Sequence, residues 1–396
     1  MSNVAIGVQP RSHDRIEIVQ VLRGFAACAV VLFHVRASVQ PPMDPLSLQQ
    51  WLFAFGGCGV DLFFCLSGFV MAYTTIGRVH RGPLDFFIRR LCRIAPAYYS
   101  ISLAFLAIMY LIEWKLGYHS PYIPDYRFTH MDVARSFLFY PMKLSEPPMF
   151  GGPVLHVGWT LNYEMYFYFV FAVSMLFGAW RWVAFFVWFA LTVFLLPLAV
   201  RGRTGIDAYI FYNWHLPYIN LITSPLNLEF VIGVVIGMLY IAHLGSRSAM
   251  LPPVVRLVVV SFFCWIMAHN FNQGFGLRHW GMYTTLLFAV FMLTGRAAGT
   301  RYPAFLLWLG DISFSLYLVG PIVTEGVYLV LLHFHDYLPP LSGIAYSFFV
   351  LSLCVCLAWP VNRLIEKRLS NALYRFLAAR LKLGCETPPS DHPKAA

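Results

Sequence analysis

The first apolar run of the chain, VLRGFAACAVVLFHVRA at residues 21–37, contains Arg23 and His34, two polar residues that could do chemistry. Arg23 and His34 are eleven positions apart, which on a helix places them within roughly 20° of one face and roughly 16 Å apart along the axis. That face would carry a permanent cation at one end and an imidazole, which exchanges protons near neutral pH, at the other. A snorkelling arginine and a hydrogen-bonded core histidine are the structural alternative. Their common face favours a functional pair.

Two carboxylates lie in later apolar runs: Asp61 in GGCGVDLFFCLSGF (56–69) and Glu164 in HVGWTLNYEMYFYFV (156–170). A charge inside a membrane is costly, so each carboxylate needs a partner. His34 is the natural candidate for Glu164, because a carboxylate bonded to one ring nitrogen raises the basicity of the other. Asp61 as a helix N-cap and Glu164 as a packing pair are the alternatives. We predict a catalytic His34 oriented by Glu164 or Asp61.

A basic cluster occupies the stretch DFFIRRLCRIAPAYY at residues 85–99. Arg89 and Arg93 are one helical turn apart, and Arg90 lies beside them. Such a cluster often only anchors the topology of a membrane protein. Guanidinium groups also grip phosphates through paired N–H donors, so the cluster equally suits a phosphorylated donor.

The elements that must position these residues are membrane helices. The chain has 396 residues, is 59% hydrophobic and only 12% charged, and has a mean hydropathy of +0.66. Roughly 20 apolar residues cross a bilayer, and runs of that length recur throughout. The sequence predicts an all-α polytopic membrane protein with about ten transmembrane helices, near 18–37, 57–76, 95–114, 158–178, 181–200, 226–244, 254–270, 280–295, 303–332 and 342–362.

The charge distribution predicts the orientation of this bundle. An even number of spans with the N-terminus inside puts about 20 Lys and Arg on the inner side and about 8 outside, so both termini are expected to be cytoplasmic. The net charge of +10 is explained by these loops rather than by nucleic acid. Residues 1–383 are expected to form a single transmembrane domain, followed by a short polar, disordered tail at 384–396. No cleavable signal peptide is apparent.

The segments 115–157 and 201–225 are expected to face outward. The second is rich in aromatic residues and is typical of an interfacial belt or of a carbohydrate-binding surface. The eight cysteines include no C-x-x-C pair, so we expect no metal site.

Taken in order, the motifs resemble those of the membrane acyltransferase-3 family, and within it the exopolysaccharide O-acetyltransferases. The resemblance rests on the Arg23 to His34 spacing, GVDLFFCLSGF, FIRRLCRIAPAYY, WTLNYEMYFY, SPLNLEFVIGVVIG around Glu229, and LGDISFSLYLVGP ending at Pro321. Two positions depart from the family pattern: Gly320 stands where many members have a histidine, and Arg368 where many have a proline. We expect no esterase-like domain, of the kind fused to some relatives, within these 396 residues.

The resemblance implies ten helices, an acyl-CoA donor on the cytoplasmic side and a carbohydrate hydroxyl as acceptor, with Arg23 and His34 essential. We therefore expect an O-acyltransferase of the bacterial inner membrane. Arg23, Arg89, Arg90 and Arg93 would bind acetyl-CoA, and His34 would act as base or accept the acyl group itself. A saccharide or lipid-linked oligosaccharide would be the acceptor, and polysaccharide synthesis machinery a possible partner. Trp159, Tyr163 and Trp214 are candidates to bind the acceptor.

Two other classes would explain the same charged residues. A transporter or flippase of a lipid-linked saccharide would line its path with them, but such proteins often show internal repeats, and none is evident here. A membrane-embedded sensor or scaffold is the third alternative.

Overall fold

The computed structural model describes residues 16–37, 48–76, 82–116, 128–143, 146–244, 253–269, 274–294, 302–333 and 343–383. These residues form helices and no strands, which confirms the all-α class. The predicted tail 384–396 lies outside the described residues. The α-helices are α1 Glu17–Ala37, α2 Leu48–Phe53, α3 Cys58–Thr75, α4 Pro83–Leu116, α5 His130–Phe137, α6 Trp159–Ser174, α7 Arg181–Phe189, α8 Leu196–Arg201, α9 Pro217–Ile222, α10 Asn227–Leu244, α11 Pro253–His269, α12 Trp280–Thr294, α13 Ala304–Asp311, α14 Ser313–His333, α15 Gly343–Val361 and α16 Ser370–Arg380.

Five shorter helical segments extend or join these elements. Three are 3₁₀ turns, which precede α3, precede α6 and follow α6: Ala54–Gly57, His156–Gly158 and Met175–Trp180. Two are π-helical and continue the helices on either side of them, so that α7 runs into α8 and α15 into α16: Ala190–Leu195 and Asn362–Leu369.

Seven helical segments in the described part of the chain are long and apolar enough to cross a membrane. Two shorter apolar helices, Leu257–Ile266 and Trp280–Leu293, lie within the predicted spans 254–270 and 280–295. One of the seven, His156–Arg201, contains the two predicted spans 158–178 and 181–200. Gly178 breaks the helix between them, with φ of 57° and ψ of −116°. The count of ten spans and the cytoplasmic termini stay predictions.

Helix α3 is the central element, in contact with α1, α10 and α12. It lies so close to α10 that a Cβ added at Gly233 would be 2.1 Å from the carbonyl oxygen of Cys65. A Cβ added at Gly68 would lie 2.0 Å from the carbonyl oxygen of Phe230. Small residues let membrane helices approach in this way, because lipid supplies no hydrophobic drive between them and packing must do so.

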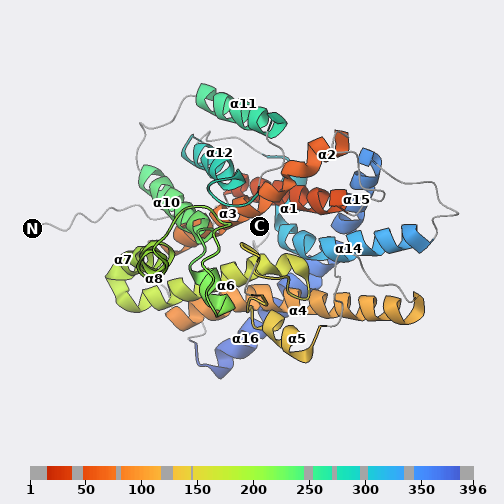
Figure 1. Ribbon diagram of the computed structural model, residues 1–396, viewed down its shortest axis with the longest axis horizontal. Helices are drawn as coiled ribbons and strands as arrows, with labels where there is room; N and C mark the ends of the chain where they lie inside the picture. Colours follow the sequence, from red (N-terminus) through yellow and green to blue (C-terminus); the bar gives the residue numbers. More distant parts are fainter. Residues whose placement is uncertain are drawn as a thin grey trace, which may run out of the picture.

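The axes of the long helices α1, α4, α6 and α14 lie roughly along one line across the molecule, parallel or antiparallel to one another, and α11 and α12 lie to one side (Figure 1). Helix α6 packs on α4 and α7, and α14 packs between α1 and α15. Helix α16 crosses α4 near its beginning. Because the C-terminal end of α1 meets the N-terminal end of α6, at His34 and His156, these two helices run in opposite directions.

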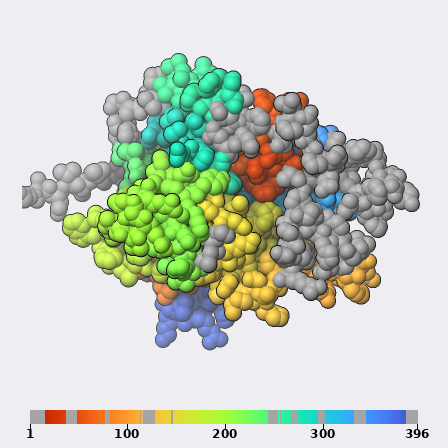
Figure 2. All heavy atoms as spheres, in the orientation of Figure 1, coloured from red at the N-terminus to blue at the C-terminus, as the bar shows by residue number. Residues whose placement is uncertain are grey.

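The aromatic segment 201–225 is an ordered loop with the short helix α9. Arg201 and Arg203 donate hydrogen bonds to the carbonyl oxygens of Asn213 and Phe211, at 2.7 Å each. The ring of Tyr218 stacks on Tyr140, with centroids 5.5 Å apart. Figure 2 shows the segment, in light green, covering one face beside the yellow segment that follows α4. The loop therefore packs against residues of the segment 128–160.

Candidate functional site

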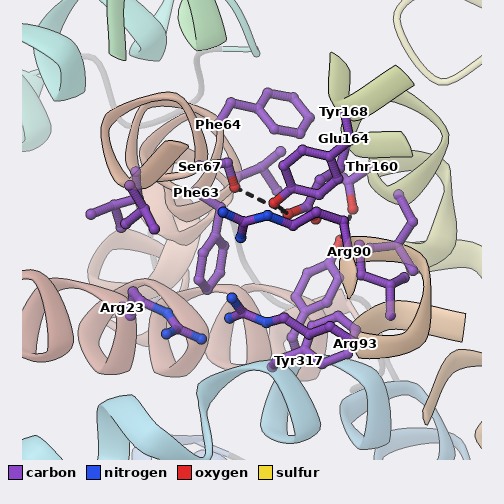
Figure 3. Close-up of a pocket in the computed structure, with 16 residues that line it drawn as sticks. Arg23, Phe63, Phe64, Ser67, Arg90, Arg93, Thr160, Glu164, Tyr168 and Tyr317 are labelled. Atoms are coloured by element: carbon purple, nitrogen blue, oxygen red, sulfur yellow. Dashed lines mark hydrogen bonds between the residues drawn. The ribbon is translucent and has the colours of Figure 1, made fainter. Parts of the chain in front are cut away.

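A pocket opens between α1, α3, α4, α6 and α14, in the interior of the bundle (Figure 3). The space between its lining side chains measures about 820 Å³, including its open mouth. The charged residues that line it are Arg23, Arg90, Arg93 and Glu164. Three guanidinium groups against one carboxylate leave two positive charges in excess. A buried site of this charge suits an anionic ligand that accepts charge-assisted hydrogen bonds.

The arginines reach the pocket from two helices. Figure 3 shows the guanidinium groups of Arg23, on α1, and Arg93, on α4, pointing toward one another. Arg90 lies over the ring of Tyr168 at 5.1 Å and donates a 3.4 Å hydrogen bond to Thr74. Two like charges that face each other in a protein interior repel, and a bound anion between them removes that repulsion.

Glu164 belongs to this pocket. Its Oε1 accepts hydrogen bonds from Tyr168 at 2.6 Å and from Ser67 at 3.2 Å. The prediction that Glu164 orients His34 is therefore wrong in this structure. The reason is depth: Glu164 lies eight residues beyond His156, or roughly 12 Å along the helix, which brings it level with Arg23 rather than with His34.

Arg89 does not line the pocket, although the sequence predicts that it binds the donor with Arg90 and Arg93. Its Nε donates to Asp85 Oδ2 at 2.8 Å, and its guanidinium lies 4.2 Å from the ring centre of Tyr374 on α16. Tyr374 also donates a 2.7 Å hydrogen bond to Asp85 Oδ1. Neighbouring residues on a helix point about 100° apart, so Arg89 and Arg90 cannot both face the pocket. Arg89 fixes α16 to α4.

His34 lies near the opposite end of α1 from Arg23. Its Nδ1 donates to the carbonyl oxygen of Val30 at 2.8 Å, which fixes the proton on that nitrogen and leaves Nε2 with a free electron pair. The neighbouring ring is that of His156, with centroids 5.1 Å apart and an angle of 51° between the planes. Sequence reasoning missed His156, although it begins the motif that contains Glu164. A histidine just before a membrane helix was the available signal.

The pocket extends toward this histidine pair. Its lining includes Thr160, one helical turn after His156, and Val60 of α3. The hydroxyl groups of Thr160 and Tyr317 lie 2.9 Å apart, and both reach the carbonyl oxygen of Val157. One turn is roughly 6 Å. The arginine pocket thus ends about a turn below the imidazoles.

Asp61 does not orient His34 either. It is fully buried, and its Oδ1 accepts a 2.7 Å hydrogen bond from the main-chain N–H of Gly276. The side chain of Glu229, from α10, lies beside it and is equally buried. Its hydrogen-bond partner is therefore the main chain and not an imidazole, whereas Asp61 Oδ2 and both carboxylate oxygens of Glu229 have no hydrogen-bond partner among the described residues. This corrects the prediction that placed Asp61 at the catalytic histidine.

The aromatic residues predicted to bind the acceptor, Trp159, Tyr163 and Trp214, are all buried. Tyr163 has no exposed surface, and its hydroxyl donates to the carbonyl oxygen of Pro148 at 2.7 Å. Trp159 is buried against Phe64. Trp214 is buried, and its Nε1 donates to a threonine of the same loop at 2.9 Å. These three side chains are buried inside the protein and do not form part of its open surface. In the described part of the chain, no group of three His, Cys, Asp or Glu residues is placed to hold a metal ion.

A bundle of helices long and apolar enough to cross a membrane, with an arginine-lined pocket and a pair of imidazoles in its interior, defines the class as a multi-pass membrane protein. Its sequence is more specific, since the family described as "Acyltransferase domain" matches residues 16–359. The chain belongs to this acyltransferase family. Over 189 residues it is 32% identical to the exopolysaccharide production protein ExoZ of Rhizobium meliloti (strain 1021). The alignment covers 47% of this chain and 51% of that protein, so the chain spans about half the length of the relative it matches. No solved structure matches the chain.

Proposed function

We propose that the protein transfers an acetyl group from acetyl-CoA to a hydroxyl of an exported polysaccharide or of its lipid-linked precursor, in the bacterial inner membrane. One observation carries the proposal: an arginine-lined pocket ends about one helical turn from the ring pair of His34 and His156. The anionic part of a donor would then bind at one end of a path along the pocket, and a basic nitrogen would lie at the other end.

The donor end is formed by Arg23, Arg90 and Arg93. Coenzyme A carries several phosphates, and guanidinium groups bind phosphate through paired N–H donors. The distance along α1 from Arg23 to His34 is roughly 16 Å, which is of the order of the pantetheine arm that joins the phosphates to the thioester. The thioester carbon would then lie at the imidazoles.

The transfer end is formed by His34. With its Nδ1 proton held by Val30, the free Nε2 can take the proton of an attacking hydroxyl or attack the thioester itself. The name of the relative from Rhizobium meliloti supports an exopolysaccharide as the acceptor. The segments 115–157 and 201–225, which are predicted to face outward, would then lie on the acceptor's side.

The test is transfer by the purified protein. Given acetyl-CoA labelled in the acetyl group and a polysaccharide repeat unit, we expect release of CoA and label in the saccharide. His34→Ala should abolish both, with an unchanged unfolding temperature. Absence of CoA release from the wild type would reject the proposal. Movement of the saccharide across a vesicle membrane without acylation would identify a transporter instead.

A further inference from the structure

The two imidazoles of the site have different freedom. His34 Nδ1 is bonded to the Val30 carbonyl oxygen, so only Nε2 of that ring is available for chemistry. His156 enters from the 3₁₀ turn before α6, and its ring lies 5.1 Å from the ring of His34. A substrate group that reaches one ring therefore reaches the other. The question is what a second imidazole can do that the first cannot.

The limit on His34 appears when it acts as a nucleophile. Once Nε2 carries an acyl group, neither nitrogen of the ring has a free electron pair, because Nδ1 keeps the proton that Val30 holds. His34 then cannot take a proton from an incoming hydroxyl. Hydroxyl attack on an acyl group is accelerated by a base within hydrogen-bond reach. That base must come from another residue.

The groups that face this end of the bundle leave few choices. Glu164 is held by Ser67 and Tyr168, about level with Arg23. Asp61 is bonded to the main chain and lies against Glu229. Another histidine, His279, is paired with the carboxylate of Asp207, so its ring is already engaged. In the described part of the chain, the base that lies beside His34 is the ring of His156.

We propose that His156 is a second catalytic residue, the general base that takes the acceptor's proton while His34 carries the acyl group. This rests on the proposed function, acyl transfer through His34. In the first step Nε2 of His34 forms a bond to the thioester carbon, and the carbon–sulfur bond breaks. The sulfur leaves as a thiolate, which needs no acid because the pKa of an ordinary thiol is about 8.5.

In the second step the acceptor oxygen bonds to the acyl carbon while its proton moves to His156. The carbon–nitrogen bond breaks, and its electron pair returns to Nε2 of His34. His156 then gives its proton to the thiolate, directly or through water. The sum is one ester and one CoA thiol from one thioester and one hydroxyl, with both histidines restored.

The experiment follows CoA release from acetyl-CoA alone, with water as the slow acceptor. For the wild type we expect a burst of about one CoA per protein and then slow turnover. His156→Asn and His156→Gln, which replace one or the other ring nitrogen by an amide, should keep the burst. Their later turnover should fall about 10²- to 10⁴-fold, the usual contribution of a general base. His34→Asn should show no burst.

Hydroxylamine separates the base from a folding defect. It attacks acyl groups without help from a base, so it should restore turnover in the His156 variants and leave His34→Asn inactive. His279→Asn, which alters an outer histidine paired with Asp207, is the matched control and should behave as the wild type.

Three results would overturn the proposal: no burst in a wild type that transfers to a saccharide, a burst lost in both His156 variants, or turnover unchanged by them. The first of these would leave the proposed function standing with direct transfer. A wild type that releases no CoA even with a saccharide would instead reject the proposed function.

Discussion

Removing Arg23 is expected to separate donor binding from stability. Its guanidinium lies in the pocket with Arg93 and Glu164, and the two arginines point toward each other. Glu164 lines the same pocket, so the charge of Arg93 opposes the cation on Arg23 and the carboxylate of Glu164 favours it. In the absence of a donor these contributions oppose one another. With phosphate bound, the repulsion becomes attraction to a common anion.

The expected loss of affinity for CoA follows from the hydrogen bonds that the bound phosphate would lose. Arg23→Met removes one charge-assisted hydrogen-bonding group from the anion, worth about 1.5 to 3 kcal/mol. This corresponds to a dissociation constant for CoA about 10- to 150-fold higher. Arg23→Lys keeps the charge and loses the planar fork, so a weakening of about tenfold is expected. The unfolding temperature of the free protein should not fall in either variant.

Calorimetric titration with CoA measures these constants, and a thermal melt without CoA measures stability. Arg89→Met is the matched control: it removes an arginine four positions from Arg93 that contacts Asp85 and Tyr374 instead of the pocket. Its affinity for CoA should equal that of the wild type, and its stability should fall. Equal loss of affinity in Arg89→Met and Arg23→Met would refute the assignment of the pocket. A reversed order would move the donor to the interface between α4 and α16.

Three further predictions concern the pocket, the packing and the topology. Glu164→Gln should tighten CoA binding several-fold, because it removes the acidic side chain from a lining that must attract an anion; weaker binding in the titration would contradict this. Gly233→Ala should cost about 1 to 3 kcal/mol of stability in a thermal melt, because its Cβ would lie 2.1 Å from a carbonyl oxygen of α3, whereas Gly326→Ala meets open space and should be neutral or stabilising. A single cysteine at Asn213 should react with an impermeant thiol reagent on intact cells and one at Arg375 should not; labelling of position 375 from outside would invert the topology.

The helical class and the position of several site residues could be predicted from the sequence. The length of the apolar runs in the sequence identifies membrane helices, since the thickness of the bilayer fixes how long such a run must be. The eleven-residue spacing of Arg23 and His34 is a property of a single helix, so it survives into the structure unchanged. Both residues lie on α1, one at the arginine pocket and one at the imidazole pair.

Pairing between helices was beyond this kind of prediction. The partner of His34 depends on how far α6 is shifted along α1, and nothing in the local sequence of α6 determines that shift. The sequence analysis chose Glu164 as the partner of His34, whereas the residue beside His34 in the structure is His156, eight positions earlier in the chain. In the same way, the choice between Arg89 and Arg90 depends on the rotation of α4, which is determined by its neighbours α6 and α16.

Asp61 and Tyr163 have partners in the structure that the sequence did not predict, for a related reason. Polar and aromatic side chains inside a membrane protein attract functional hypotheses, yet the bundle must also satisfy its own buried groups. Asp61 accepts a hydrogen bond from a main-chain N–H, and the hydroxyl of Tyr163 donates one to a main-chain carbonyl oxygen. Sequence shows that a group needs a partner and not which one it finds.

The central position of α3 has a consequence for how sequences of this kind can diverge. In an 18-residue apolar stretch of the span Trp51–Thr75, which contains α3, 78% of the residues are buried inside the protein, against 22% in such a stretch of the span His156–Arg201. Most of α3 therefore meets other helices, so a substitution there requires a matching change in a neighbour. On α7 and α8 any apolar side chain that fits in lipid will serve. Related chains should therefore differ freely along the lipid-facing helices and keep α3 nearly constant, including glycines that carry no chemistry at all.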